Sequence, residues 1–446
     1  MKNRFGLSLL VLVVGILFFA NPAAAEGEMV QVRLQVRDAE GERIPVPDVA
    51  FTVTDSSGAE VGTGVTDAEG IFRLEVPGAG EYTVAIDPES FPEGVTLDDP
   101  EAASRTISLN EGATGNAIFA VSSVAGGGGS TESGISVRRV AQLTVDGLKL
   151  GLFLGMAAIG LSLIFGTTGL VNFAHSEMIA MGYFAAYFFN FYGLAGLFGF
   201  LAGLPGPFGG GVNLIFATLL AVIVGAGFGW LLDFALFSPL RRMGVSLIAQ
   251  LVVTIGLSIV LRYGFLLVFG GTQRFYADYT AQRARTYLGL VDLTDKDFIT
   301  MVISVAVLVA VGLVLAKTRI GKAMRAVSDN RDLAESSGID VERVIRLVWV
   351  AGGALAALGG VFLGLSETVN WLLGFRMLLL IFAGVTLGGL GTTYGALVGC
   401  LLVGMGIQLS TLFIPIELKN AGALAVLIGI LMFRPQGILG QAERIG

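Results

Sequence analysis

Reactive and metal-binding side chains are scarce in this chain of 446 residues, which contains one cysteine and one histidine. The lone Cys400 cannot form an intrachain disulfide, and it lies in an apolar run, which favours a packed small side chain over redox chemistry. No Ser/His/Asp set or His/Cys cluster is available for a hydrolase or a metal site. The phosphate-binding pattern G-x-x-x-x-G-K-[ST] is missing too, because Gly321-Lys322 is followed by alanine. We therefore expect no enzyme and no bound ATP on this chain.

Charge is the second scarce property. Only 14% of the residues are charged and 54% are hydrophobic, with a mean hydropathy of +0.77. A soluble domain carries about 25% charged residues, so most of this chain is expected to lie in a lipid bilayer. The 64 glycines fit a bundle of membrane helices, in which small residues let backbones approach closely.

The charges that are present divide the chain into two parts. Residues 26–134 contain 20 acidic and 5 basic side chains, a net of −15, whereas residues 135–446 contain 15 acidic and 21 basic ones, a net of +6. Before the acidic part, Lys2 and Arg4 precede an apolar run and three alanines, the order of a secretory signal peptide over 1–25. An uncleaved signal anchor is the alternative. Both interpretations deliver the next segment outside the cytoplasm.

Residues 26–125 are predicted to form an extracytoplasmic β-sandwich. Apolar and polar residues alternate over 30–36, 49–53 and 81–86, and turn signals separate these runs. Short strands at this spacing are typical of a small sandwich. The run T-D-A-E-G-I-F from Thr66, followed by G-E-Y-T-V from Gly80, resembles the carboxypeptidase-regulatory-like or prealbumin-like family. This resemblance implies a fold and no activity.

Residues 126–139, which begin with Gly-Gly-Gly-Gly-Ser, are predicted to be a flexible linker to a membrane part at 140–446. The expected fold class is an all-α polytopic membrane protein with about eight or nine transmembrane or re-entrant helices, joined to the N-terminal β-sandwich. The predicted apolar segments are 143–165, 169–190, 213–237, 246–269, 298–316, 345–366, 373–391, 394–414 and 420–433.

Basic residues indicate the orientation of these segments. They gather in the break 317–346 and at Arg241-Arg242, which the positive-inside rule places in the cytoplasm. Starting outside and counting the predicted crossings puts both breaks and the C-terminus on that same side. The expected location is the cell (inner or plasma) membrane, with the N-terminal domain outside.

Two predicted membrane segments contain polar or glycine interruptions. Polar side chains within an apolar run must face protein or water, and paired broken segments are typical of a midplane pathway in transporters. Interhelical hydrogen bonding without substrate contact is the alternative. The residues that carry these interruptions, and are our candidates for a translocation pathway, are Gly166, Gly169, Asn172, His175, Glu177, Gly384, Gly388 and Gly389.

The basic break 317–346 predicts a short cytoplasmic helix at about 328–336, which starts at an Asn or Asp and stops at Gly338. Such a helix between two spans is a candidate docking surface, and a loop that only fixes topology is the alternative. The candidate coupling residues are Arg325, Asp329, Asp332, Leu333, Ala334, Glu335 and Gly338.

Four motifs follow one another along 140–440, namely G-L-S-L-I-F-G…N-F-A-H at 160–175, T-I-G-L-S-I at 254–259, T-R-I-G-K-A-M-R-A-V at 318–327 and R-P-Q-G at 434–437. Together they resemble the LivH-type permease subunit of branched-chain amino acid ABC importers. Related urea and amide permeases share the motifs, so the solute stays open. The resemblance implies a sister LivM-like permease subunit, two cytoplasmic ATPase subunits that hold ATP and Mg²⁺, and an extracytoplasmic solute-binding protein. It implies membrane lipid as surroundings, no cofactor on this chain and no nucleic acid.

The resemblance also implies that the 317–346 loop docks on an ATPase. The E-A-A-x-x-x-G signature of such permeases is matched in part, since Asp332-Leu333-Ala334 stands before Gly338. Ordinary members lack the exported sandwich, for which we expect a role as a tether or docking aid. Two other classes stay open: a proton-coupled secondary transporter that uses Glu177 or His175, and a membrane-anchored adhesion or scaffold protein.

Overall fold

The computed structural model describes residues 29–37 and 43–123 with short gaps, then 136–194, 211–414 apart from 280–283 and 288, and isolated positions between 418 and 439. The predicted signal peptide and most of the predicted linker lie outside the described residues. The chain divides into two compact units, one built from the β-rich segment that ends at Ser136 and one from the helices that begin at Val137.

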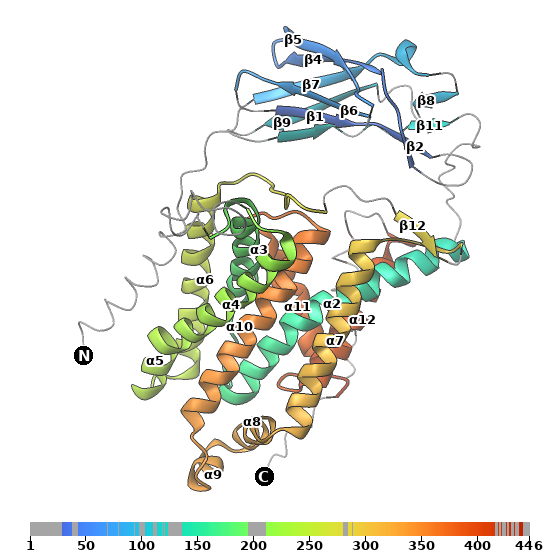
Figure 1. Ribbon diagram of the computed structural model, residues 1–446. Coiled ribbons are helices and arrows are strands. Elements are labelled where there is room, and N and C mark those ends of the chain that lie inside the picture. Colours follow the sequence, from blue (N-terminus) through green and yellow to red (C-terminus); the bar gives the residue numbers. More distant parts are fainter. Residues whose placement is uncertain are drawn as a thin grey trace. The chain divides into compact units, whose positions relative to one another are not determined.

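Two sheets form most of the β-rich unit (Figure 1). The antiparallel four-stranded sheet has the order β5 (Glu60–Val65), β4 (Ala50–Asp55), β7 (Gly80–Ile86), β9 (Ser104–Leu109). In the other sheet, β1 (Met29–Arg33) pairs parallel with β10 (Thr114–Ala117) and antiparallel with β6 (Ile71–Glu75). The smaller elements are the pairs β2 (Gln35–Arg37) with β3 (Arg43–Pro45) and β8 (Val95–Leu97) with β11 (Val121–Ser123), and the 3₁₀ turn η1 (Pro88–Ser90).

The alternation seen in the sequence decides which face of each sheet is buried. Val30 and Val32 of β1 and Phe51 and Val53 of β4 are almost completely buried, as every second residue of a half-buried strand should be. The Phe51 ring stacks on Phe72 of β6 at 5.4 Å between centroids, so the two sheets share one core. A β-rich N-terminal unit is therefore confirmed, and the shared core agrees with the predicted sandwich.

The helical unit follows the predicted apolar segments closely. Its helices are α2 (Val137–Thr168), α3 (His175–Tyr192), α4 (Leu214–Leu232), the π-helical η5 (Asp233–Phe237), α5 (Ser238–Arg242), α6 (Leu247–Phe269), α7 (Asp295–Lys317), α8 (Arg319–Asp329), α9 (Arg331–Ser336), α10 (Val341–Ser366), α11 (Leu373–Gly388) and α12 (Thr393–Ser410). A hairpin of β12 (Ala284–Tyr287) and β13 (Val291–Thr294) precedes α7.

Among the described residues, 6 helices are long and apolar enough to cross a membrane: α2, the continuous run from α4 to α5, α6, α7, α10 and α12. The polar start of α3 lowers its hydropathy, and α11 is only 16 residues long. The predicted segment 420–433 lies outside the described residues except for isolated positions. A multi-pass membrane protein is thus confirmed, whereas the predicted number of about eight or nine spans is not.

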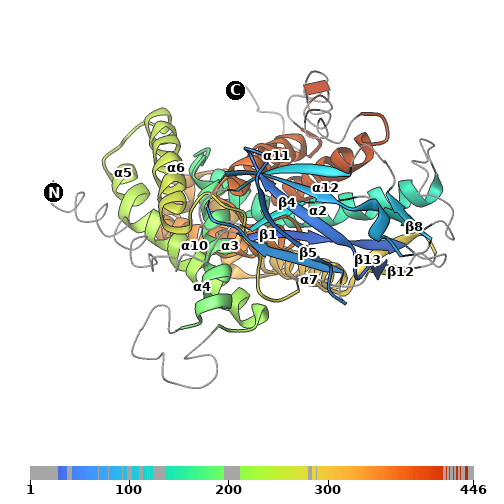
Figure 2. The same cartoon turned by 90° about the horizontal axis from the view of Figure 1, so that it is seen from above.

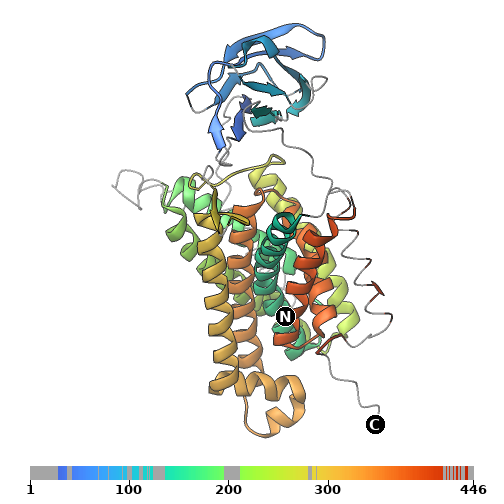
Figure 3. The ribbon, with the colours of Figure 1, turned by 90° about the vertical axis from the view of Figure 1, so that its right-hand side faces the viewer.

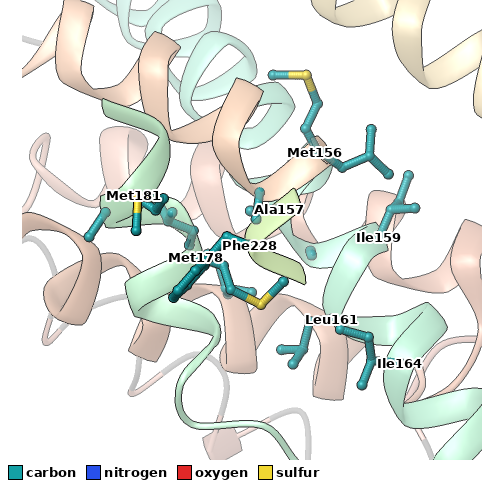
Figure 4. Close-up of a cluster of buried hydrophobic side chains, with 14 of the residues drawn as sticks. Met156, Ala157, Ile159, Leu161, Ile164, Met178, Met181 and Phe228 are labelled. Carbon is teal, nitrogen blue, oxygen red and sulfur yellow. The ribbon is translucent and has the colours of Figure 1, made fainter. Parts of the chain in front are cut away.

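The buried centre of the helical unit is formed by α2 and α10, whose most apolar windows are 78% and 72% buried, against 28% for α6 and 22% for α7. Figure 2 shows the helices of this unit from above. Side chains such as Met156 and Ile159 of α2, Met178 of α3 and Phe228 of α4 fill the core (Figure 4). The sides of α6 and α7 that face away from this centre are therefore largely exposed.

Candidate functional site

A break between α2 and α3 carries the first group of predicted residues. The α2 helix ends at Thr168, and Gly169 then takes a positive φ of 70°, which favours glycine. Asn172 is buried, and its side-chain oxygen accepts a hydrogen bond from Ala174 N at 3.0 Å, just before α3 begins. Polar groups thus stabilise an irregular segment inside the bundle.

The start of α3 lies well within the span of α2. His175 Nε2 is 2.8 Å from the carbonyl oxygen of Ala157, and both residues are fully buried. Ala157 precedes the end of α2 at Thr168 by 168 − 157 = 11 residues, which is about 16 Å along a helix axis. The α3 helix therefore begins beside the interior of α2 and not beyond its end, an arrangement that resembles the broken helices of transporters. The His175 contact joins α3 to α2.

Glu177 forms the charged centre of this region. Its Oε1 accepts hydrogen bonds from Ser176 Oγ at 2.9 Å and Ser258 Oγ at 3.1 Å, and from Arg262 Nη2 at 3.1 Å. Arg262 Nη2 also donates to Ser258 Oγ at 2.8 Å. Only 1% of the Glu177 side chain and 12% of the Arg262 side chain are exposed. The carboxylate thus links α3 to α6 through a buried, hydrogen-bonded ion pair.

The start of α11 completes the wall around this ion pair. The Arg262 guanidinium lies over the Phe375 ring, 3.9 Å from its centroid, and 48% of Phe375 is exposed. The Tyr183 hydroxyl donates to the Asn370 carbonyl oxygen at 3.0 Å and accepts from Gly374 N at 3.2 Å. A cation over an aromatic face, beside an ionised acid, can recognise polar and charged parts of a small solute.

The glycines predicted to interrupt the second segment have two different structural roles. The α11 helix continues through Gly384 and ends at Gly388, so these two do not interrupt it as predicted. A Cβ on Gly384 would meet Cys400 Sγ, and one on Gly388 would meet the Gly395 carbonyl oxygen, so both allow α12 to pack closely. The interruption lies at Gly389, whose φ is 112°.

Gly166 belongs to a second cluster, at the end of α2. A Cβ at Gly166 would lie 3.1 Å from Ser328 Oγ in α8 and 3.2 Å from the Gly391 carbonyl oxygen in the turn between α11 and α12. Three segments distant in the sequence therefore meet there. The glycine-rich turn and the segment predicted to be cytoplasmic both lie close to Gly166.

The segment 319–336 forms two helices where one was predicted at about 328–336. Asn330 leaves the helical conformation, with φ −159° and ψ 108°, and its side chain accepts from Leu333 N at 2.9 Å. This cap ends α8 and starts α9, while the predicted stop at Gly338 has a φ of 84°. The helix α8 was not predicted. Figure 3 shows both helices projecting at one end of the unit, beyond α7 and α10.

Most of the predicted coupling residues are accessible on this projection. Leu333 is 64% exposed, whereas Ala334 is buried against the bundle. Arg325 Nη2 donates weakly to the Ala316 carbonyl oxygen at 3.5 Å. The residues exposed to solvent are Arg325, Asp329, Asp332, Leu333, Glu335 and Gly338.

Arg262 and Asp233 lie inside predicted spans and were not among the predicted site residues. Both were visible as ionisable residues within apolar runs, the signal that flags functional or paired positions in a membrane. Within the described part of the chain, no group of three His, Cys, Asp or Glu side chains is placed to hold a metal ion.

Comparison with known proteins assigns the helical unit to a family. Residues 143–433 match the family described as branched-chain amino acid transport system, permease component. The high-affinity branched-chain amino acid transport system permease protein LivH of Escherichia coli K12 is 28% identical over 308 residues, covering 68% of this chain and 96% of the relative. BraD of Pseudomonas aeruginosa is 28% identical over 306 residues, with the same coverage. A probable LivH of Methanocaldococcus jannaschii is 27% identical over 299 residues, covering 64% of this chain and 88% of the relative. The chain therefore belongs to the family of branched-chain amino acid transport permease components.

Proposed function

We propose that this chain is the membrane permease subunit of an ABC importer for branched-chain or other aliphatic amino acids, or for a related small solute such as urea or an amide. The family match over most of the helical unit is the observation that carries this proposal. Separate ATPase subunits would drive transport, together with a sister permease subunit and an extracytoplasmic solute-binding protein. The chain itself would bind neither ATP nor Mg²⁺.

The translocation pathway would pass the α3 start and the Glu177–Arg262 pair. Three observations support this placement. The pair is buried, the Phe375 ring against Arg262 is about half exposed, and irregular backbone lies at 169–174, just before α3. Irregular backbone at membrane depth is tolerated where it lines a cavity or is buried in protein. Replacement of Glu177 by Gln should reduce uptake while ATPase recruitment stays intact.

The projecting helices α8 and α9 would dock on the ATPases at the cytoplasmic face. The basic residues of 317–346 support this orientation, in which the β-rich unit would lie outside. There it would tether the importer or help the solute-binding protein to dock. Deletion of 26–125 tests this role: uptake and partner recruitment equal to those of the full chain would contradict it.

Affinity purification of the tagged full chain from its native membrane, followed by mass spectrometry, tests the assembly. We expect ATPase subunits to co-purify. Leu333→Asp should reduce their recovery by about 30-fold, because an apolar anchor at the centre of an interface contributes about 2 kcal/mol or more. Met243→Asp is the matched control, since Met243 is 50% exposed in the other predicted cytoplasmic break.

Recovery without any ATPase in mild detergent would refute the importer. A proton-coupled secondary transporter would then be the better interpretation, and Glu177 the first residue to replace.

A further inference from the structure

A chain of ion pairs runs from α9 into the interior of the helical unit. Arg331 Nη2 of α9 lies 3.0 Å from Glu342 Oε1 at the start of α10. Arg241 Nη2 of α5 lies 2.9 Å from Glu342 Oε2 and 2.7 Å from Asp233 Oδ1 of η5. Four elements are thus joined, and one of them is the helix proposed to dock on an ATPase.

Burial increases steadily along this chain of charges. The side chains of Arg331, Glu342, Arg241 and Asp233 are 43%, 27%, 7% and 0% exposed. Solvent and salt screen the outer pair, so it is weak and can open readily. The inner pair lies in a low-dielectric interior and stays closed unless another cation replaces its partner. A displacement of α9 is therefore expected to break the ion pair between Arg331 and Glu342 and to leave the inner pair intact.

A second cation stands beside the inner end of the chain. Arg346 Nε lies 3.8 Å from Asp233 Oδ2, and both atoms are buried without a hydrogen-bond partner in the described structure. A charge-assisted hydrogen bond needs about 2.7–2.9 Å, so the two groups are about 1 Å too far apart. A small movement of α10 against η5 would satisfy both groups at once.

The backbone around Asp233 is suited to such a movement. Asp233 begins the π-helical η5, a conformation found mostly at functional sites in helices. Phe237, the last residue of η5, stacks on Trp349 of α10 at 4.7 Å between centroids and 19° between planes. Arg346 and Trp349 are one helical turn apart, so one face of α10 contacts both ends of η5.

We propose that Asp233 and Arg346 are positioning residues that couple α9 to the α4–α5 span, an inference that rests on the proposed importer function. With α9 in the position seen here, Arg331 binds Glu342 and Arg346 is held just short of Asp233. When the ATPases displace α9, Arg331 leaves Glu342. The α10 helix then shifts until Arg346 Nε donates to Asp233 Oδ2, and η5 moves with it. Two discrete arrangements of one packed interface are thereby linked to the docking helix.

The test uses the complete importer in proteoliposomes, with solute uptake and ATP hydrolysis measured separately. Arg346→Gln should lower the solute taken up per ATP hydrolysed by at least about fivefold, the lower end of usual coupling between sites. Arg346→Lys retains the charge and should restore most of that ratio. Arg343→Gln, an exposed arginine of the same helix, should leave the ratio unchanged.

The double variant Asp233→Asn/Arg346→Gln separates coupling from stability. It removes both charges of the proposed contact, and Arg241 keeps Glu342 as its partner, so the complex should assemble even if Arg346→Gln alone does not. A ratio that stays low in the assembled double variant supports the proposal. A ratio equal to that of the wild type in either variant overturns it. Absence of ATP-dependent uptake in the wild-type importer would instead overturn the proposed function.

Discussion

Gly338 ends α9, and the effect of replacing it can be derived from the backbone. Its φ of 84° lies in the left-handed region. Its N–H donates to the Glu335 carbonyl oxygen at 2.9 Å, and Ile339 N donates to that of Ala334 at 3.1 Å. A Cβ at Gly338 would meet no atom within 4 Å. Gly338→Ala therefore introduces backbone strain and no steric clash.

The strain for a residue other than glycine in this region is about 1–2 kcal/mol. One kcal/mol changes a two-state population about fivefold. We expect Gly338→Ala to increase opening of the last turn of α9 by about five- to thirtyfold. Gly338→Asn should have a smaller effect, because asparagine enters the left-handed region more readily.

Hydrogen exchange of the amides in 334–339 of the full chain measures this opening. Gly227→Ala is the matched control, since a Cβ there also meets no atom within 4 Å and the residue lies inside α4. Exchange in Gly338→Ala equal to that of the wild type would refute the derivation from backbone strain. Equal acceleration in the alanine and asparagine variants would show that loss of glycine, rather than the left-handed φ, determines the effect.

Three further perturbations test other parts of the molecule. Glu177→Gln leaves the buried Arg262 without its carboxylate, a change that costs about 3–5 kcal/mol of stability, so the thermal midpoint of the protein in detergent should fall. The double variant with Arg262→Gln should recover part of that loss. Additive losses in the double variant would contradict a direct pair. Phe51→Ala should destabilise the β-rich unit by about 3–5 kcal/mol and speed its proteolysis in the full chain, whereas the exposed Val65→Ala should change stability by less than about 0.5 kcal/mol. Solute uptake by intact cells should stop when ATP is depleted and the proton gradient is kept. Uptake should continue when a protonophore collapses the gradient and ATP is kept. The opposite pattern would favour a proton-coupled transporter.

Segment positions were predictable because long apolar runs are bounded by charge or glycine. The predicted run 246–269 corresponds to α6 (Leu247–Phe269), and 213–237 corresponds to α4 with η5. In the β-rich unit, the alternation over 81–86 corresponds to the buried face of β7. The apolar runs of the helices and the alternation of the strands are local patterns, set by the surroundings of each element.

The partners of the charged residues were not predictable, because they are brought together by packing. Arg262 reaches Glu177 from a helix 85 positions away, and Arg241 reaches Glu342 across 101 positions. An unpaired charge within a membrane is strongly unfavourable, so each such residue requires a partner. The sequence therefore predicts that such a residue is paired, but only the fold shows which residue is its partner. The division of 319–336 into α8 and α9 likewise depends on a single cap at Asn330.

The glycines around the end of α11 also differ in ways that depend on tertiary packing. Gly384, Gly388 and Gly389 look alike in the sequence, where each interrupts an apolar run. In the fold, Gly384 and Gly388 are helical and lie against α12, while Gly389 takes a positive φ and ends the helix. The backbone of Gly389, at φ 112° and ψ 111°, lies outside the left-handed helical region that asparagine can enter, and no side chain fits where Gly395 contacts Gly388. Gly389→Asn should therefore weaken assembly of the importer through backbone strain and Gly388→Asn through a steric clash. An importer that assembles normally with Gly389→Asn would show that the helix does not end where the structure places it.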